Sequence, residues 1–219
     1  MISLCTPSRN RPADFKKFSD SIWNTVSDKK NVEICVYRDD DDDSEYEYSG
    51  NYKLITGKRV FPDAAYNECQ KIATGPIYIF CPDDILFLTP GWDKEMEDVF
   101  SKSKDKILFV HLDDNYSRSN FGKVGGLHKN WVDTVEYFFN PTICRGGDVV
   151  INRLSKALNR RIMLRHFYIK DLKIITDKTH KEYMNLIDAN RHHLWNSREI
   201  QEEKIRALKA LQNFIDTHK

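Results

Sequence analysis

Two adjacent aspartates, Asp83 and Asp84, follow a short apolar segment, Ile77–Cys81, in the 219-residue chain. The segment is rich in aromatic and β-branched residues and is preceded by Gly75-Pro76, a pattern that predicts a buried strand. Ligands of open α/β sheets bind beyond the carboxyl ends of strands, where these aspartates would lie. Two carboxylates in such a position are suited to holding a hard divalent cation beside a phosphate-bearing ligand.

A second group of residues suited to binding a ligand consists of Ser8, Arg9 and Arg11. These residues lie in the predicted loop between a first strand, Ile2–Cys5, and a helix that begins at Pro12. Arginine side chains in such a loop are able to hold a diphosphate through several planar hydrogen bonds. The alternative is a surface loop with solvated arginines, and position alone favours neither interpretation.

A run of five aspartates, 39–43, follows the second predicted strand, Val32–Tyr37. Consecutive carboxylates repel one another, so we expect most of the run to be an exposed and solvated loop. Asp39 is the exception, because it follows the strand closely enough to reach a nucleoside. We expect Tyr46 and Tyr48, further along, to cover the loop rather than to stack on a ligand.

The elements that must position these residues alternate between strands and helices in the first half of the chain. Further strands are predicted at Tyr52–Thr56, Ile107–Leu112, Ile162–Leu164 and Lys173–Ile175. Helices are predicted over Pro62–Ile72, Trp92–Phe100, Leu127–Phe138, Val149–Leu158 and, after a capping Ser197, up to Asp216 with Ile205 facing inward. This alternation predicts an α/β/α sandwich with a mixed, mostly parallel central sheet and a C-terminal helix.

Composition and charge limit the class of protein. A formal net charge of +1 argues against wholesale electrostatic binding of nucleic acid. No apolar run approaches the ~20 residues needed to span a bilayer, and the N-terminus lacks the features of a signal peptide. The five cysteines match no metal-binding spacing, so we expect buried free thiols in a reducing compartment. We therefore expect a cytoplasmic protein with no membrane span.

Taken in order, these features resemble the family-2 glycosyltransferases of the GT-A (Rossmann-like) fold. The resemblance rests on the first strand leading to Thr6–Arg11, the acidic residue after the second strand, a helix bearing Asn67, and the aspartate motif of Pro82–Asp93. That motif is especially similar to those of small viral and bacterial members. Gly126-Leu127-His128 and Gly147-Asp148 are similar to the acceptor half of the family.

The resemblance covers roughly residues 1–181. It implies one domain over residues 1–219, with a nucleotide-sugar-binding half at 1–112, an acceptor-binding half at 113–190 and a C-terminal helix at 191–219. It implies inverting transfer of a sugar from a nucleotide-sugar, usually a UDP-sugar, to an acceptor hydroxyl, with Mn²⁺ or Mg²⁺ at the diphosphate. The chain carries no Gln-x-x-Arg-Trp motif of processive synthases, which favours transfer of single sugars.

The resemblance also implies roles for individual residues. Donor binding is implied for Pro7, Ser8, Arg9, Arg11, Asp39, Asn67 and Asp83. The metal ligands would be Asp84 and His180, with His166, His192 and His193 as alternatives to His180. The general base would be Asp148, and the acceptor contacts His128 and Trp131. The alternative for Asp148 is a helix cap, and the alternative for His128 and Trp131 is core packing.

Two departures from the family pattern concern its acids. Pro82 stands where many relatives have a first acid, and Gly147 stands where an acid often precedes the base. The absent first acid leaves open a non-catalytic nucleotide- or sugar-binding module. A nucleotidyltransferase is another alternative, but that class usually has a glycine-rich phosphate loop after the first strand, and Thr6–Pro12 contains no glycine.

The acceptor is the least defined part of the interpretation. We favour a glycan, including a protein-linked glycan. A nucleic acid with a modified base is an alternative, since Arg153–Arg165 and Lys204–Lys209 are basic. A solvated helix face explains the same basic residues. The sequence does not indicate an oligomeric state.

Overall fold

The computed structural model describes residues 1–114, 120–172, 181–182, 184–185, 188 and 197–218. The strands are β1 (Ile2–Ser8), β2 (Val32–Asp39), β3 (Tyr52–Gly57), β4 (Ile77–Phe80), β5 (Ile85–Phe87), β6 (Phe109–Asp113), β7 (Gly125–His128) and β8 (Arg161–Asp171). The helices are α1 (Pro12–Thr25), α2 (Pro62–Ile72), α3 (Trp92–Ser101), α4 (Lys129–Val135), α5 (Gly147–Ala157) and α7 (Arg198–Thr217), with a short 3₁₀ turn at Lys29–Asn31.

The strands form one sheet in the order β3-β2-β1-β4-β7-β6-β8-β5. Strands β1 to β4 run parallel to one another, and β7 runs antiparallel between β4 and β6. The long strand β8 pairs in parallel with β6 at its start and antiparallel with β5 at its end. The sheet is therefore mixed and mostly parallel, and the carboxyl ends of β1, β2 and β4 lie side by side.

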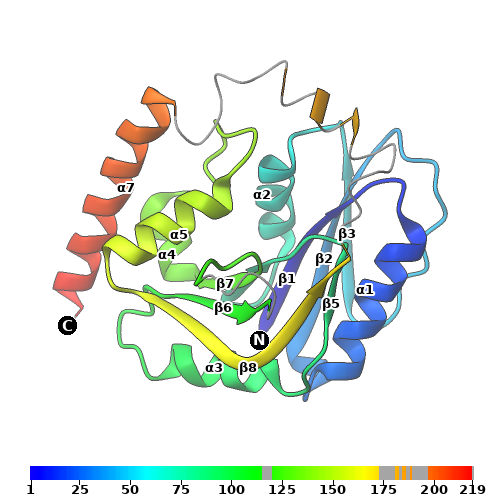
Figure 1. The fold of residues 1–219 in the computed structure, drawn as a ribbon, viewed down its shortest axis with the longest axis horizontal. Coiled ribbons are helices and arrows are strands. Elements are labelled where there is room, and N and C mark those ends of the chain that lie inside the picture. Colours follow the sequence, from blue (N-terminus) through cyan, green and yellow to red (C-terminus); the bar gives the residue numbers. More distant parts are fainter. Residues whose placement is uncertain (115–119, 173–180, 183, 186–187, 189–196, 219) are drawn as a thin grey trace.

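Each face of the sheet has its own core, because successive strand residues point to opposite sides. On one face Cys5 and Cys35 pack with buried side chains of α2, α4, α5 and α7. On the other face Leu4 and Ile34 pack with α1 and α3. Figure 1 shows these two groups of helices on opposite sides of the strands, which confirms the predicted α/β/α sandwich. All five cysteines are buried and free, as predicted.

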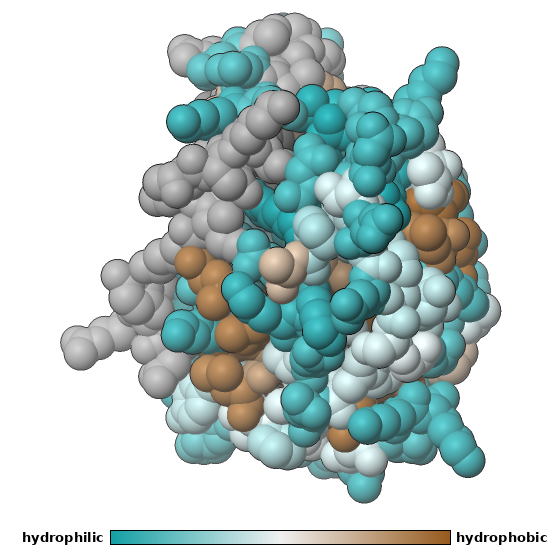
Figure 2. All heavy atoms as spheres, turned by 90° about the vertical axis from the view of Figure 1, so that its right-hand side faces the viewer, coloured by the Kyte–Doolittle hydropathy of each residue, from teal (hydrophilic) through white to brown (hydrophobic). Residues whose placement is uncertain are grey.

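The outer surface on the α1 side is mostly hydrophilic (Figure 2). Hydrophobic residues form only small, separate groups on that face among the residues coloured there. This is the expected surface for a helix such as α1, which buries Phe15, Phe18 and Ile22 against the sheet and turns its charged side chains outward. No helix in the described part of the chain is long and apolar enough to cross a lipid bilayer.

The first strands and helices begin where the sequence predicts, but two strands run further. Helices α1 and α2 begin at Pro12 and Pro62, where a missing backbone N–H costs nothing. Strand β1 continues through Pro7 to Ser8, so both are strand residues rather than loop residues. Strand β2 likewise continues to Asp39. Pro7, Ser8 and Asp39 therefore stand on strands, whereas Arg9, Arg11 and Asp83 lie beyond the strand ends.

Strands β5 and β7 were not predicted from the sequence. Gly125 and Gly126 of β7 have the composition of a loop, and the prediction of a helix from Leu127 is wrong. A Cβ atom at Gly125 would overlap Cε2 of Phe109, so β6 and β7 approach too closely for any other residue. Helix α4 consequently begins later, at Lys129.

The C-terminal helix α7 packs against α4 and α5 through buried residues such as Ile200 and Leu211. Ile205 was predicted to face inward, which is wrong, because it is 55% exposed. Ser197 precedes the helix but makes no side-chain capping hydrogen bond. The strand predicted at 173–175 lies outside the described residues.

Candidate active site

A cleft of about 560 Å³ opens at the carboxyl ends of β1, β2 and β4. The first turns of α2 and α5 also line it, and helix N-termini carry a partial positive charge that favours anions. The predicted site residues that line the cleft are Pro7, Ser8, Arg9, Arg11, Asp39, Asp83, Asp84 and Asp148. The fold thus brings together arginines and carboxylates that are far apart in the sequence.

Asp83 is a buried carboxylate held from the β1 side of the cleft. Ser8 Oγ donates a 2.6 Å hydrogen bond to Asp83 Oδ2, and Arg11 Nη1 donates one of 3.3 Å to Oδ1. Burial raises the pKa of Asp83 to about 6, and the neighbouring charge of Asp84 adds to the rise. Arg11 and Ser8 oppose it, because they stabilise the ionised form. These bonds hold Asp83, in the turn after β4, against the end of β1.

Asp84 lies near Asp171, which the sequence interpretation missed. Strands β5 and β8 pair so that Ile85 stands opposite Asp171, and both aspartates line the cleft. Burial raises the pKa of Asp84, and the charge of Asp171 raises it further. Lys123 Nζ lies 3.5 Å from Asp171 and 3.2 Å from Asp114. Two carboxylates and a lysine therefore form this corner of the cleft.

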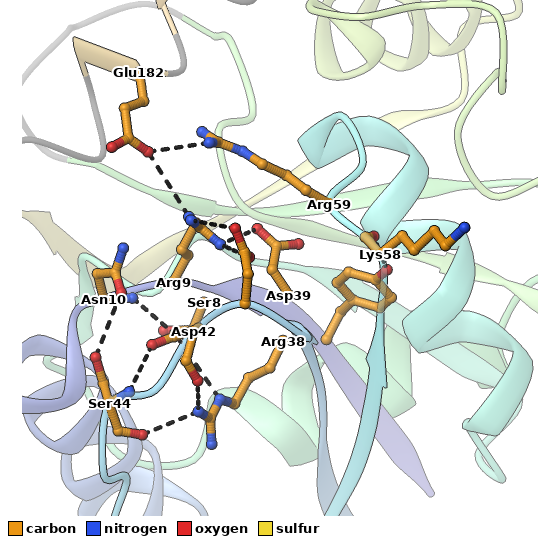
Figure 3. Close-up of polar contacts among 12 residues, drawn as sticks. Ser8, Arg9, Asn10, Arg38, Asp39, Asp42, Ser44, Lys58, Arg59 and Glu182 are labelled. Carbon is orange, nitrogen blue, oxygen red and sulfur yellow. Dashed lines mark hydrogen bonds and ion pairs between the residues drawn. The ribbon is translucent and has the colours of Figure 1, made fainter.

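Arg9 lies within a cluster of charged side chains at the mouth of β1 and β2 (Figure 3). Arg9 donates to Asp39 Oδ2 at 3.1 Å and pairs with both carboxylate oxygens of Asp41. Glu182 Oε2 lies 3.9 Å from Arg9 Nε and 3.1 Å from Arg59 Nη1. Burial raises the pKa of Asp39, and Arg9 opposes this rise. Arg9 and Arg59 therefore both line the cleft, and each is paired with carboxylates there.

Asp40, Asp41 and Asp43 are exposed, as predicted for most of the aspartate run, but Asp42 is buried. It is 5% exposed and accepts hydrogen bonds from Asn10 N (2.9 Å), Ser44 N (3.0 Å) and Tyr46 Oη (3.1 Å). Its hydrogen bond to Asn10 N holds this loop against the residues that follow β1. Tyr46 Oη also accepts a 3.2 Å hydrogen bond from Arg11 N, so Tyr46 covers the loop as predicted.

Asp148 lies in the first turn of α5. The N-cap of this helix is Gly146, with φ 99°, a backbone conformation that favours glycine, and α5 has no side-chain cap. Asp148 Oδ1 accepts a 2.8 Å hydrogen bond only one residue away, from Val149 N. Burial raises the pKa of Asp148. Asp148 is therefore not the N-cap residue of α5, although its carboxylate accepts a first-turn backbone N–H as the helix-terminus alternative predicts.

Asp63, in the first turn of α2, is a second carboxylate on this wall of the cleft. Its Oδ2 accepts a 2.9 Å hydrogen bond from Gly147 N, and the residue is 7% exposed. Burial raises the pKa of Asp63 to about 7, and the charge of Asp148 adds to the rise. The sequence interpretation missed Asp63, because an aspartate after Pro62 reads as an ordinary helix-start residue.

The sequence profile described as Glycosyl transferase family 2 matches residues 3–167. The chain belongs to glycosyl transferase family 2. The motif resemblance therefore predicted the family correctly, and the protein is a glycosyltransferase. Among curated proteins, no sequence matches this glycosyltransferase.

Solved structures resemble the glycosyltransferase in fold at low sequence identity. TarS from S. aureus is 14% identical with a TM-score of 0.60, and the match covers 97% of this chain but only 43% of TarS. A TarS 1–349 structure in complex with UDP-GlcNAc is also 14% identical, with a TM-score of 0.60 and coverage of 99% of this chain and 72% of that one. The mannosyltransferase PcManGT from Pyrobaculum calidifontis, in complex with GDP-Man and Mn²⁺, is 12% identical, with a TM-score of 0.61 and coverage of 99% and 74%. These likenesses confirm the GT-A fold.

Asn67 of the glycosyltransferase does not line the cleft. Its Nδ2 donates a 2.7 Å hydrogen bond to Phe139 O. Its Oδ1 accepts from Phe138 N (3.0 Å) and Phe139 N (2.9 Å). Because the whole amide serves these backbone groups, Asn67 holds the segment after α4 in place, and we do not retain it as a donor-binding residue.

The two predicted acceptor contacts also lie away from the cleft. His128 stands opposite Ile77, at the start of β4 and thus at the other end of the sheet. Its Nδ1 accepts a 3.1 Å hydrogen bond from Asn130 N as the cap of α4, and burial lowers its pKa to about 4. Trp131 is 2% exposed within the core. His180, the predicted second metal ligand, lies outside the described residues.

Proposed function

We propose that this glycosyltransferase moves a single sugar from a nucleotide-sugar, with a UDP-sugar favoured, to an acceptor hydroxyl with inversion at the transferred carbon. The observation that carries the proposal is that one cleft holds Arg9 and Arg11, the Asp84–Asp171 pair, and Asp148 on a different wall. In such a cleft, the groups that would stabilise the leaving diphosphate lie apart from the carboxylate that would take the proton of the attacking hydroxyl.

The donor half of the proposal rests on the arginines. Departure of a nucleoside diphosphate builds negative charge on its phosphate oxygens. Arg9, Arg11 and Arg59 line the cleft, where their positive charges would stabilise that charge. Arg9 would exchange part of its pairing with Asp39 and Asp41 for hydrogen bonds to the phosphates. Asp39, beside Arg9, would accept from the base or the ribose. The neighbours in complex with UDP-GlcNAc and GDP-Man have the same fold, so both nucleotides belong in the donor test.

The Asp84–Asp171 pair would suit a divalent cation that displaced Lys123, whose Nζ lies 3.5 Å from Asp171. Mg²⁺ and similar ions are commonly held by one or two carboxylates together with substrate phosphates, rather than by a complete protein cage. Among the described residues no group of three His, Cys, Asp or Glu side chains is placed to hold a metal, so donor phosphates would complete the coordination. When bound, Mn²⁺ or Mg²⁺ would stabilise charge on the departing diphosphate.

Asp148 is the proposed general base. The acceptor hydroxyl oxygen attacks the anomeric carbon while Asp148 accepts the hydroxyl proton. The bond from that carbon to the phosphate oxygen breaks, and the diphosphate leaves with the electron pair. A single displacement of this kind inverts the configuration. Burial of Asp148 raises its proton affinity, which suits a base.

The acceptor is proposed to be a glycan hydroxyl. Phe121 and Phe139 line the same cleft, and Tyr66 stacks on Phe139 with ring centroids 4.8 Å apart. Phe139 and Tyr66 are largely buried, so Phe121, which is partly exposed, is the ring that would offer a sugar apolar contact area. A hydroxyl on a modified nucleobase is the other candidate.

Nucleotide binding followed by turnover tests this function. We expect UDP to raise the Tm, and UDP with Mn²⁺ to raise it further. A nucleotide-release screen of UDP- and GDP-sugars should then identify the donor, and mass spectrometry of glycan acceptors should detect the added sugar. Absence of stabilisation by UDP, GDP and other nucleoside diphosphates would contradict the proposal.

A further inference from the structure

The residue before Asp148 has no side chain, and a carboxylate from another helix lies beside it. A Cβ atom at Gly147 would overlap the ring of Phe139 and would lie 2.9 Å from Asp63 Oδ2. Position 147 therefore requires glycine, and the space next to it is filled by Phe139 and by the Asp63 carboxylate from α2.

Asp63 is held firmly in this position. It is 7% exposed, and its Oδ2 accepts the 2.9 Å hydrogen bond from Gly147 N, the first residue of α5. The bond joins the N-terminal turns of α2 and α5, which are 84 residues apart in the chain. Both turns line the cleft, so this contact sets the position of the helix turn that carries Asp148.

The charged groups around Asp63 come from both helices. Asp148 and Arg145 act on it from the α5 side, and their charges have opposite effects. The charge of Asp63 contributes to the raised pKa of Cys144, before α5, and of Tyr66, on α2. Burial and Asp148 raise the pKa of Asp63 to about 7, whereas the Gly147 N–H and Arg145 lower it.

We propose that Asp63 is a positioning residue for Asp148, which it serves by fixing the first turn of α5 through Gly147 and by placing a second negative charge beside the base. The inference rests on the proposed role of Asp148 and adds to it. Interaction between two carboxylates is reciprocal, so an ionised Asp63 makes Asp148 hold a proton more strongly in the transition state. Asp63 itself exchanges no proton with the acceptor.

The pH dependence follows from the titration of Asp63. Asp63 takes up a proton as the pH falls through about 7. Asp148 then loses its charged neighbour and becomes a weaker base. The wild-type rate should therefore fall on acidification as Asp63 becomes protonated.

Asp63→Asn tests the role of the charge, because the amide oxygen still accepts the Gly147 N–H. We expect kcat of this variant to lie roughly three- to tenfold below the wild type at pH 8.5 and to equal it near pH 5.5. A purely structural role would give the same ratio at every pH. Asp93→Asn is the matched control, because Asp93 is also a buried aspartate in a first helical turn and accepts from Ser27 N and Asp28 N away from the cleft.

A reciprocal titration tests the same coupling without turnover. In the wild type, ¹³C NMR should show the Asp63 carboxyl titrating near pH 7, and Asp148→Asn should lower that midpoint by about one unit. A pH-independent rate ratio for Asp63→Asn, or an unchanged Asp63 midpoint in Asp148→Asn, would overturn the inference. Full turnover by Asp148→Asn would instead overturn the proposed base, so the two failures are distinguishable.

Discussion

Ser8 Oγ and Asp83 Oδ2 are joined by a 2.6 Å hydrogen bond that links the ends of β1 and β4. Asp83 is only 4% exposed, so water contributes little to solvating its carboxylate. Ser8 and Arg11 are therefore the groups that keep a buried negative charge at the floor of the cleft.

Ser8→Ala should destabilise the fold, because it removes one of these donors from a buried charge. We expect the free energy of unfolding in urea to fall by about 1.5–3 kcal/mol at pH 8. The loss should shrink at pH 5, below the pKa of Asp83 of about 6, where the carboxyl is neutral. Ser101→Ala, at an exposed serine of α3, should change stability by less than about 0.5 kcal/mol. Equal losses of stability in the two variants would contradict the role of Ser8 as a hydrogen-bond donor to the buried Asp83 carboxylate.

Arg9→Gln should weaken binding of UDP, because a neutral amide cannot replace a guanidinium at a diphosphate. The expected loss is about tenfold or more in Kd by isothermal titration calorimetry. Lys16→Gln, which removes an exposed charge from α1, is the control and should bind UDP as the wild type does. Unchanged UDP affinity in Arg9→Gln would exclude this arginine from the donor site.

Asp84→Asn and Asp171→Asn should each remove the extra thermal stabilisation that Mn²⁺ gives in the presence of UDP. The physical reason is that each change removes one of the two carboxylates available to the ion. Asp133→Asn, at an exposed aspartate paired with Lys129, should leave the Mn²⁺ effect intact. Persistence of that effect in both cleft variants would place the cation elsewhere.

Asp63→Asn should make stability less dependent on pH. Since the folded-state pKa of Asp63 is raised to about 7, the folded protein holds a proton there that the unfolded chain has already lost above pH 4. The contribution of Asp63 to the free energy of unfolding is therefore greatest below about pH 4 and falls as the pH rises towards 7. The variant should gain up to about 4 kcal/mol over the wild type at pH 8, with little difference at pH 4, by urea unfolding. A constant difference across this range would contradict the shifted pKa.

The regular elements of the first half were predictable because local signals mark them. Pro12 and Pro62 mark helix starts, and the apolar Ile77–Phe80 marks a buried strand. Strand β7 was not predictable, because Gly125 is required by close approach of Phe109, a contact made only in the folded sheet. The order of the strands likewise depends on contacts between distant segments.

The candidate site shows the same division. The presence of Arg9 and Asp148 in one cleft was predictable because their positions match family motifs. Asp63 and Asp171 have no motif of their own, and their proximity to Asp148 and Asp84 arises from packing between elements. Asn67 was misassigned for the opposite reason, since its motif position does not reveal that its amide binds the backbone after α4.

The most direct test of the central claim is sugar transfer by Asp148→Asn, with Asp93→Asn as a control variant. The account predicts that Asp148→Asn loses at least about 100-fold in acceptor-dependent nucleotide release, because the acceptor proton has no base, while UDP affinity stays within about twofold of the wild type. Asp93→Asn should retain the wild-type rate. Full turnover by Asp148→Asn, or loss of UDP binding together with activity, would contradict the assignment of Asp148 as the base.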